Sequence, residues 1–249
     1  MSEFHEEAGL QPEARVAFGR VAPAGKRGLF VTFEGIEGSG KTTQVTRLAD
    51  RLLAAGEDVL VTREPGGSPL GRRLRSLLLE DRGRPIDPLA ELHLYVADRI
   101  QHIRDVVEPA LAQGRVVLCD RFADATAAYQ GYGRGLGAGL VAALHRNAPL
   151  DLRPDRTILF DLDPETGLER ARSRNRELGT EASEGRFESE RIEFHRRVRD
   201  GYLALASAEP FRFRIVAAEQ DLDAVEARVA DLLADLFPCL DVEGFEDAP

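Results

Sequence analysis

One eight-residue segment restricts the fold of this chain more than any other feature. It reads Gly35-Ile36-Glu37-Gly38-Ser39-Gly40-Lys41-Thr42 and matches the pattern G-x-x-x-x-G-K-[ST] in full. An apolar run at residues 29–34 precedes it, and a helical period of apolar residues follows it. Glycines in such a turn let backbone N–H groups surround phosphate oxygens, while the helix N-terminus faces their negative charge. We therefore predict a phosphate-binding loop between a buried strand and a helix.

This loop supplies candidate ligands for ATP and Mg²⁺. We expect Lys41 to reach the β and γ phosphate oxygens and the Thr42 hydroxyl to bind Mg²⁺. Of the 33 lysine and arginine residues only Lys26 and Lys41 are lysines, so Lys41 stands out against the arginine preference of the chain. The predicted ATP-binding residues are Gly35, Gly38, Ser39, Gly40, Lys41, Thr42 and Thr43.

Short apolar runs rich in β-branched residues recur along the chain. They lie at residues 29–34, 58–62, 115–120, 157–162 and 211–216. Each run is nearly continuous rather than alternating, as expected for strands buried on both faces of a parallel sheet. Helical periods separate the runs, and this alternation predicts a three-layer α/β fold with a five-stranded parallel sheet flanked by helices.

The third of these runs ends in a carboxylate, Asp120. Phosphotransferases with this type of loop use a carboxylate at the end of a second strand to hold Mg²⁺. Apolar runs that end in Asp are common, so the pattern becomes informative only beside the phosphate-binding loop. Together they predict Thr42 and Asp120 as metal ligands.

Composition excludes several classes of protein. The formal net charge of −10 disfavours a nucleic-acid binder, whose footprint is a basic surface. No apolar run approaches the ~20 residues of a membrane-spanning helix. The two cysteines, Cys119 and Cys239, make no disulfide framework, and Cys119 lies in an apolar run that suits a core residue. We therefore expect a cytoplasmic protein that binds neither nucleic acid nor membrane.

The periodic part of the sequence is bounded by two polar segments. Residues 1–27 carry no sustained period and predict a disordered N-terminal extension, and residues 238–249 read as an acidic C-terminal tail. A single domain is expected at residues 28–237.

Five segments, in this order, resemble bacterial thymidylate kinases. They read FEGIEGSGKTT at 33–43, TREPGG at 62–67, ADRIQH at 97–102, LCDRF at 118–122 and AYQGYGRG at 128–135. The resemblance covers nearly everything between the two tails. It implies a P-loop kinase fold with a mobile lid at about 170–188, and a homodimer. It also implies that the γ-phosphoryl group of ATP passes to the 5′-phosphate of dTMP, giving dTDP and ADP, a step of dTTP synthesis.

The resemblance also assigns residues to the acceptor. Tyr95 and Arg99 lie four apart, on one face of a helix, where the ring would stack on thymine and the guanidinium would donate to its 4-oxo group. Glu37 would accept from the sugar 3′-hydroxyl, and Arg75 and Arg121 would hold the 5′-phosphate. The full predicted substrate-binding set is Glu37, Arg75, Tyr95, Arg99, Arg121, Thr126, Tyr129 and Gln130.

The phosphate-binding loop lacks an arginine, so the resemblance implies that the lid supplies one. The predicted catalytic residues are Lys41, Asp120, Arg121 and Arg186, with Arg174 as the alternative to Arg186. The second pKa of a phosphate monoester is ~6, so the acceptor needs no general base near neutral pH. Catalysis would consist of positioning and charge neutralisation.

The chain departs from the family pattern at three positions. The family has Tyr where this chain has Phe122, Phe where it has Tyr95, and Ser where it has Ala125. The segment 178–185 also lengthens the lid. Two rival functions stay open. One is a kinase of another deoxynucleotide or a deoxynucleoside; the other is a GTP-dependent switch, which should carry an Asn-Lys-x-Asp sequence that this chain lacks.

Overall fold

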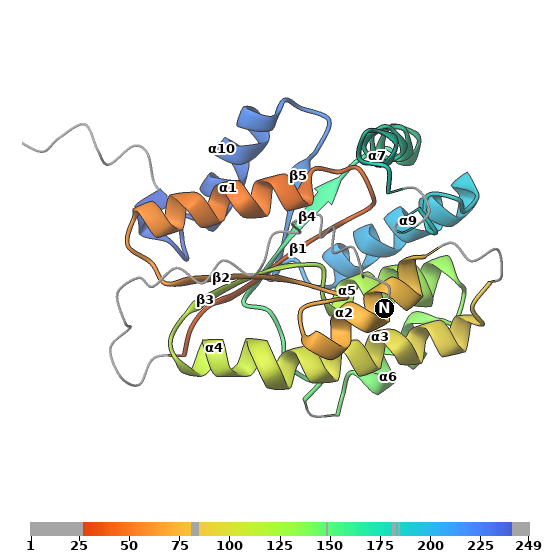
Figure 1. Ribbon diagram of the computed structural model, residues 1–249. Coiled ribbons are helices and arrows are strands. Elements are labelled where there is room, and N and C mark those ends of the chain that lie inside the picture. Colours follow the sequence, from red (N-terminus) through yellow and green to blue (C-terminus); the bar gives the residue numbers. More distant parts are fainter. Residues whose placement is uncertain (1–26, 81–84, 148, 181–182, 184, 241–249) are drawn as a thin grey trace, which may run out of the picture.

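A five-stranded parallel sheet forms the centre of the chain (Figure 1). The structure, a computed structural model, describes residues 27–80, 85–147, 149–180, 183 and 185–240. The strands follow the order β2-β3-β1-β4-β5. Their bounds are β1 Phe30–Gly35, β2 Val59–Arg63, β3 Val116–Asp120, β4 Arg156–Asp161 and β5 Phe213–Ala217. Each predicted strand overlaps one of them, so the predicted α/β fold is confirmed.

Helices connect the strands and cover both faces of the sheet. The described α-helices are α1 Lys41–Ala54, α2 Pro69–Leu79, α3 Pro88–His102, α4 Glu108–Ala112, α5 Ala123–Thr126, α6 Ala138–Leu144, α7 Pro164–Leu178, α9 Ile192–Ala208 and α10 Leu222–Leu233. Two π-helical segments, η1 Ile103–Val107 and η2 Ala127–Gly133, and a 3-10 turn, η3 Pro238–Leu240, complete them.

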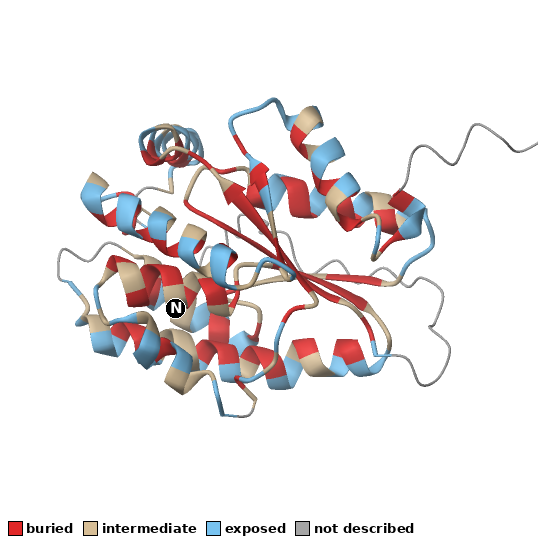
Figure 2. Cartoon of the chain, turned by 180° about the vertical axis from the view of Figure 1, so that it is seen from behind, coloured by how far each residue is buried: buried red, intermediate tan, exposed pale blue. Residues whose placement is uncertain are grey.

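Side chains alternate between the two faces of the central strands. On β3, Val116 and Leu118 join the cluster that contains the apolar residues of α1 and α10. Val117 and Cys119 point the other way, into a cluster with η1 and α4. This period of two is the normal consequence of strand geometry, and the burial of both sets explains why the runs read as continuous. Figure 2 shows the central strands buried along their length.

Three helices near the carboxyl ends of the strands begin in the same way. A polar cap residue precedes a proline, at Ser68 before α2, Asp87 before α3 and Asp163 before α7. Each cap side chain accepts from backbone N–H groups of the first turn, and proline suits that turn because its missing N–H is not needed there. These cap residues and prolines determine where the three helices that border the cavity begin.

Both π-helical segments lie in longer helical stretches. The segment η1 ends just before Pro109, a residue that cannot donate a backbone hydrogen bond to an α-helix. A π turn lets the chain continue as a helix past it, so α3, η1 and α4 run on as one long element (Figure 1). The segment η2 carries Tyr129 and Gln130 into the interior.

The expected boundaries can be compared with the packed domain. The predicted N-terminal extension lies outside the described residues except for Arg27, which pairs with Asp155 at 2.9 Å. At the other end Leu240 is buried in the core, so packing continues three residues into the predicted tail. The arginine run of the predicted lid lies in the second half of α7, which ends at Leu178 and is capped by Gly179 in a left-handed conformation. No helix among the described residues is long and apolar enough to cross a membrane.

Candidate active site

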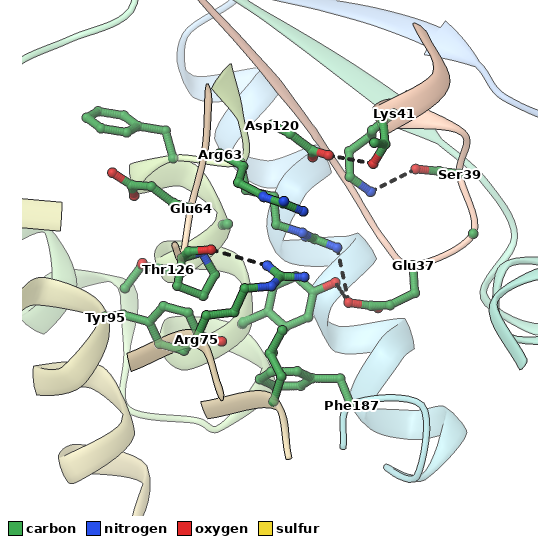
Figure 3. A pocket seen from close by; sticks show the side chains of 18 of the residues that line it. Glu37, Ser39, Lys41, Arg63, Glu64, Arg75, Tyr95, Asp120, Thr126 and Phe187 are labelled. Carbon is green, nitrogen blue, oxygen red and sulfur yellow. Dashed lines mark hydrogen bonds and ion pairs between the residues drawn. The ribbon is translucent and has the colours of Figure 1, made fainter. Parts of the chain in front are cut away.

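A cavity of about 410 Å³ opens beside the ends of β1, β2 and β3 (Figure 3). In open α/β sheets, ligands bind outside these carboxyl ends. The cavity brings together residues from the phosphate-binding loop, α2, α3, η2 and the lid. Its lining consists of Glu37, Gly38, Ser39, Gly40, Lys41, Thr42, Thr43, Arg63, Glu64, Pro65, Arg75, Leu79, Tyr95, Arg99, Asp120, Arg121, Phe122, Ala125, Thr126, Tyr129, Gln130, Arg174, Phe187 and Glu188.

The phosphate-binding loop places Lys41 at one end of this cavity. Helix α1 begins at Lys41, directly after Gly40, whose φ of 82° lies in the left-handed region that favours glycine. Lys41 Nζ donates to Ile36 O at 2.6 Å and to Ser39 Oγ at 3.1 Å. Burial, and to a lesser extent the charge of Arg121, lowers the pKa of Lys41 to about 7. An anion beside Nζ would restore the charged form.

The two predicted metal ligands lie together. Thr42 Oγ1 donates to Asp120 Oδ2 at 2.6 Å, so a hydroxyl and a carboxylate meet at the end of the loop. Mg²⁺ prefers oxygen ligands and is commonly held by one or two carboxylates together with substrate phosphates. Among the described residues, no group of three or more His, Cys, Asp or Glu side chains could hold a metal ion. The Thr42 hydroxyl and the Asp120 carboxylate fit Mg²⁺ as two oxygen ligands.

Arg121 follows Asp120 and occupies the middle of the cavity. Its φ of 69° makes it the one described non-glycine residue with a positive φ, a conformation that costs free energy and clusters at functional sites. Arg121 Nη1 donates to Gly35 O at 2.9 Å, and Nη2 donates to Glu37 Oε1 at 3.1 Å. The guanidinium also lies over the ring of Tyr129, 5.0 Å from its centre.

Glu37 lies in the phosphate-binding loop but points its carboxylate away from Lys41 (Figure 3). Its Oε1 accepts from Arg121 and from the Tyr129 hydroxyl at 2.6 Å, and His195 Nδ1 lies 3.6 Å from Oε2. Burial opposes the charged form, but Arg121 and His195 outweigh it and hold the pKa of Glu37 well below its usual range. The structure thus separates this acid from the side of the loop on which phosphate is expected.

Arg99 forms the opposite end of the cavity. It is 1% exposed and donates from Nε to Glu64 Oε2 at 2.7 Å. Its Nη2 donates to Phe122 O at 3.0 Å and to Thr126 Oγ1 at 2.9 Å, and Nη1 lies 2.6 Å from His145 Nε2. Because an arginine only donates, His145 Nε2 accepts here. Four of the five guanidinium N–H groups are used in this way, which holds Arg99 rigidly.

The remaining predicted acceptor residues also line the cavity. Tyr95 lies one helical turn before Arg99 on α3, and Gln130 and Tyr129 come from η2. Arg75 comes from α2 and donates to Pro65 O at 3.2 Å. In Figure 3 the Arg75 side chain lies beside Tyr95. All eight predicted substrate-binding residues therefore meet in one cavity.

The two candidate lid arginines are placed differently. Arg174, on α7, lines the cavity and has a half-exposed side chain, 3.7 Å from Glu188. Arg186 does not line the cavity. It is 8% exposed, donates to Leu78 O at 2.5 Å and pairs with the buried Glu91. This placement favours Arg174, the alternative, over Arg186.

Several cavity residues had no role in the sequence analysis. Glu64, from the TREPGG segment, holds Arg99 and also contacts His102 Nδ1 at 2.8 Å. Arg63 and Phe187 line the walls. Two sequence signals point to Glu64: it lies in the TREPGG segment, and it follows a predicted strand whose end should lie at this edge of the sheet.

Glu34 lies buried beneath Arg121. Its carboxyl group accepts from Phe122 N at 2.7 Å and from the Tyr202 hydroxyl at 2.8 Å. Burial, with the nearby Asp124 adding to it, raises the pKa of Glu34 to about 8. At neutral pH Glu34 is therefore largely a neutral acid below a positively charged side chain.

Known proteins resemble this chain over most of its length. The family model described as Thymidylate kinase matches residues 33–229. The chain belongs to the thymidylate kinase family. It is similar to the thymidylate kinase of Solidesulfovibrio magneticus, with 56% identity covering 81% of this chain and 96% of that protein. It is also similar to that of Desulfovibrio desulfuricans, with 56% identity covering 77% and 88%. Among solved structures, thymidylate kinase from Ehrlichia chaffeensis matches with a TM-score of 0.66 and 34% identity, covering 83% of this chain and 98% of that one.

The pKa of Glu34 gives the stability of this chain a testable pH dependence. The folded state keeps a proton on Glu34 that the unfolded state releases above its ordinary pKa of 4.5, so raising the pH from about 5 to about 8 favours unfolding. Glutamine mimics the neutral acid and removes the contribution of Glu34 to the pH dependence of stability. We expect the stability of the Glu34→Gln variant, relative to the unsubstituted chain, to increase steadily over that range.

Urea unfolding at pH 5, 6.5 and 8 measures this difference. The Glu37→Gln variant is the matched control, because the pKa of Glu37 is lowered and its charge does not change in this window. A stability difference between Glu34→Gln and the unsubstituted chain that stays constant with pH would show that Glu34 is ionised throughout.

Proposed function

We propose that this chain converts dTMP to dTDP in the cavity described above, with ATP as phosphoryl donor and Mg²⁺ bound by Thr42 and Asp120. One observation carries the assignment of the site. A phosphate-binding loop with Lys41 forms one end of the cavity, a fixed guanidinium with an aromatic ring forms the other, and Arg121 lies between them. Two nucleotides that meet end to end, phosphate to phosphate, match this order.

The acceptor would lie with its base against Tyr95 and Arg99. The remaining N–H of Arg99, on Nη1, would donate to the 4-oxo group of thymine. Thr126 and Gln130 would line the space around the same base. Glu37 would accept from the sugar 3′-hydroxyl. Arg75 and Arg121 suit the 5′-phosphate because a forked guanidinium can bind two phosphate oxygens at once.

The donor would lie along the loop. Lys41 exchanges its contacts with Ile36 O and Ser39 Oγ for phosphate oxygens, and the exchange stabilises its charged form. When bound, Mg²⁺ neutralises charge on the phosphates and orients them. The acceptor phosphate is itself the nucleophile, so the protein positions it and gathers positive charge from Lys41, Arg121 and a lid arginine around the transferring group.

A test of the function compares acceptors in a coupled assay of ADP release. We expect dTMP to drive ADP release far more than dUMP, dCMP or AMP, and EDTA to stop it. A pocket that encloses one methyl group discriminates by about tenfold to 200-fold, which sets the expected preference over dUMP. Equal turnover of all four acceptors would favour a kinase of broader specificity, and ADP release that ignores the acceptor would contradict the proposal.

We further propose that Arg174 rather than Arg186 supplies the lid charge, because Arg174 lines the cavity and Arg186 is paired with Glu91. Replacing Arg174 by Ala should lower kcat by about 10³-fold, the usual effect of removing an arginine that stabilises a phosphoryl-transfer transition state. The control is Arg176→Ala, an exposed arginine on the same helix, which should change kcat only slightly.

Steady-state kinetics and thermal unfolding of the Arg186→Ala variant complete this test. We expect Arg186→Ala to lower the melting temperature, because it leaves Glu91 with one partner fewer. A loss of kcat in Arg186→Ala at unchanged stability, with Arg174→Ala fully active, would restore the assignment to Arg186.

We also propose that two copies of the chain form a homodimer. Helices α2 and α3 pack on each other and expose apolar residues in pairs that share a helix face. Leu70 and Leu77 lie on α2, and Leu89 and Ile100 lie on α3. Each is 37–46% exposed, and large apolar side chains gathered in this way mark interaction surfaces.

Light scattering should give a mass twice the 27.4 kDa of one chain. The double variant Leu77→Glu/Ile100→Glu should be monomeric because it buries two charges in the interface. Leu222→Glu, at an exposed apolar position on α10, should leave the mass unchanged. A monomeric unsubstituted chain would refute the dimer.

A further inference from the structure

A second buried carboxylate lies behind the base end of the cavity. Glu91, on α3, is fully buried and is one helical turn before Tyr95. Its Oε1 accepts from Gln130 Nε2 at 2.7 Å and from Arg134 Nε at 3.2 Å. Its Oε2 accepts from Arg134 Nη2 at 3.2 Å and from Arg186. Two arginines therefore balance its charge, and Gln130 is its third partner.

This contact determines which end of the Gln130 amide faces the cavity. A carboxylate only accepts hydrogen bonds, so the NH₂ end of the amide must point toward Glu91. Gln130 is 1% exposed and lines the cavity, and its carbonyl oxygen is the end that remains for a ligand. The side chain is thereby presented as an acceptor.

The orientation matters for the choice of base. Thymine and uracil carry a donor at N3 and an acceptor at O4, whereas cytosine carries an acceptor at N3 and a donor at N4. An acceptor from Gln130 beside a donor from Arg99 matches thymine at both positions. Cytosine would meet an acceptor with an acceptor and a donor with a donor. A flipped amide would offer its NH₂ group to N3 of cytosine instead.

We propose that Glu91 is a positioning residue for specificity, which holds the Gln130 amide in the orientation that accepts from N3–H of thymine and rejects cytosine. This inference rests on the proposed location of the acceptor base in the cavity. Glu91 acts through Gln130 and touches no substrate itself. Glu91 also joins the base end of the cavity to the lid. It pairs with Arg186, and Arg186 directly precedes Phe187 of the cavity wall.

The test is the Glu91→Gln variant. Its amide can both donate and accept, so the side-chain amide of Gln130 can flip. Dissociation constants are measured by calorimetry for dTMP, dUMP and dCMP, together with kcat and KM for each. We expect the preference for dTMP over dCMP to fall by about tenfold or more, as one reversed hydrogen bond implies. The preference for dTMP over dUMP should stay within about twofold, because both bases present the same N3–H and O4 to Gln130 and Arg99.

Two further variants separate specificity from support of the structure. Arg134→Met removes another partner of Glu91 but leaves its bond to Gln130, and it should keep the dTMP to dCMP ratio. Glu91→Asp keeps an acceptor-only group and should restore part of the ratio. A Glu91→Gln variant that leaves Arg186 unpaired and fails to fold is replaced by Glu91→Gln/Arg186→Met. The second substitution removes the unpaired charge, and the preference of the double variant for dTMP over dCMP tests the role of Glu91.

The outcomes distinguish this inference from the proposed function. Equal losses for dTMP, dUMP and dCMP in folded Glu91→Gln would overturn the role of Glu91 and leave a purely structural one. An unsubstituted chain that does not phosphorylate dTMP would instead overturn the proposed function.

Discussion

The guanidinium of Arg121 joins the parts of the cavity that have to act together. It binds Gly35 O at the start of the phosphate-binding loop and Glu37 within it, and it covers the ring of Tyr129. The residue takes up a positive φ that only the surrounding structure can enforce. Asp120 before it belongs to β3, and Phe122 N after it is bound by the buried Glu34. The sheet thus determines where this charge lies relative to the loop and to Asp120, one of the two proposed metal ligands.

The same principle recurs in and beside the cavity, where arginines are paired with glutamates that are buried or nearly so. Arg121 pairs with Glu37, Arg99 with Glu64, and Arg186 with Glu91. A buried ion pair contributes little net stability, but removal of one partner leaves an uncompensated charge and costs several kcal/mol. These pairs therefore fix geometry more than they add stability. Donors held in place before substrate arrives need no reorganisation during the reaction, which is the condition for electrostatic catalysis.

Local patterns in the sequence were enough to predict the parts of the site that lie on one element. The loop around Lys41 follows from a motif between a strand and a helix, and Asp120 follows from the end of a strand. Long-range partners left no such pattern. His145 contacts Arg99 across 46 positions, and Arg186 contacts Glu91 across 95, so neither the fixation of Arg99 nor the direction of Arg186 could be predicted.

Helix type is a second structural feature that the sequence did not predict. Thr126 and Gln130 lie four residues apart, the spacing of neighbours on an α-helix, but a π-helical segment begins between them at Ala127. The wider turn changes which side chains share a face, and no local periodicity reports it.

The chain is acidic overall, yet its proposed ligands are anions. The two are compatible because salt screens the repulsion between a ligand in the cavity and the distant surface charges. Six basic and four acidic side chains line the cavity, and three of the acids, Glu37, Glu64 and Glu188, are paired with arginines. Beyond about 8 Å, salt screens the repulsion from the rest of the surface, while contacts inside a hollow of about 410 Å³ are screened far less. A mononucleotide places its charge inside the cavity, within about 8 Å of the side chains that line it. A nucleic acid would extend its phosphates over the acidic exterior, so the net charge of −10 acts against polymers and leaves the single nucleotide to the cavity.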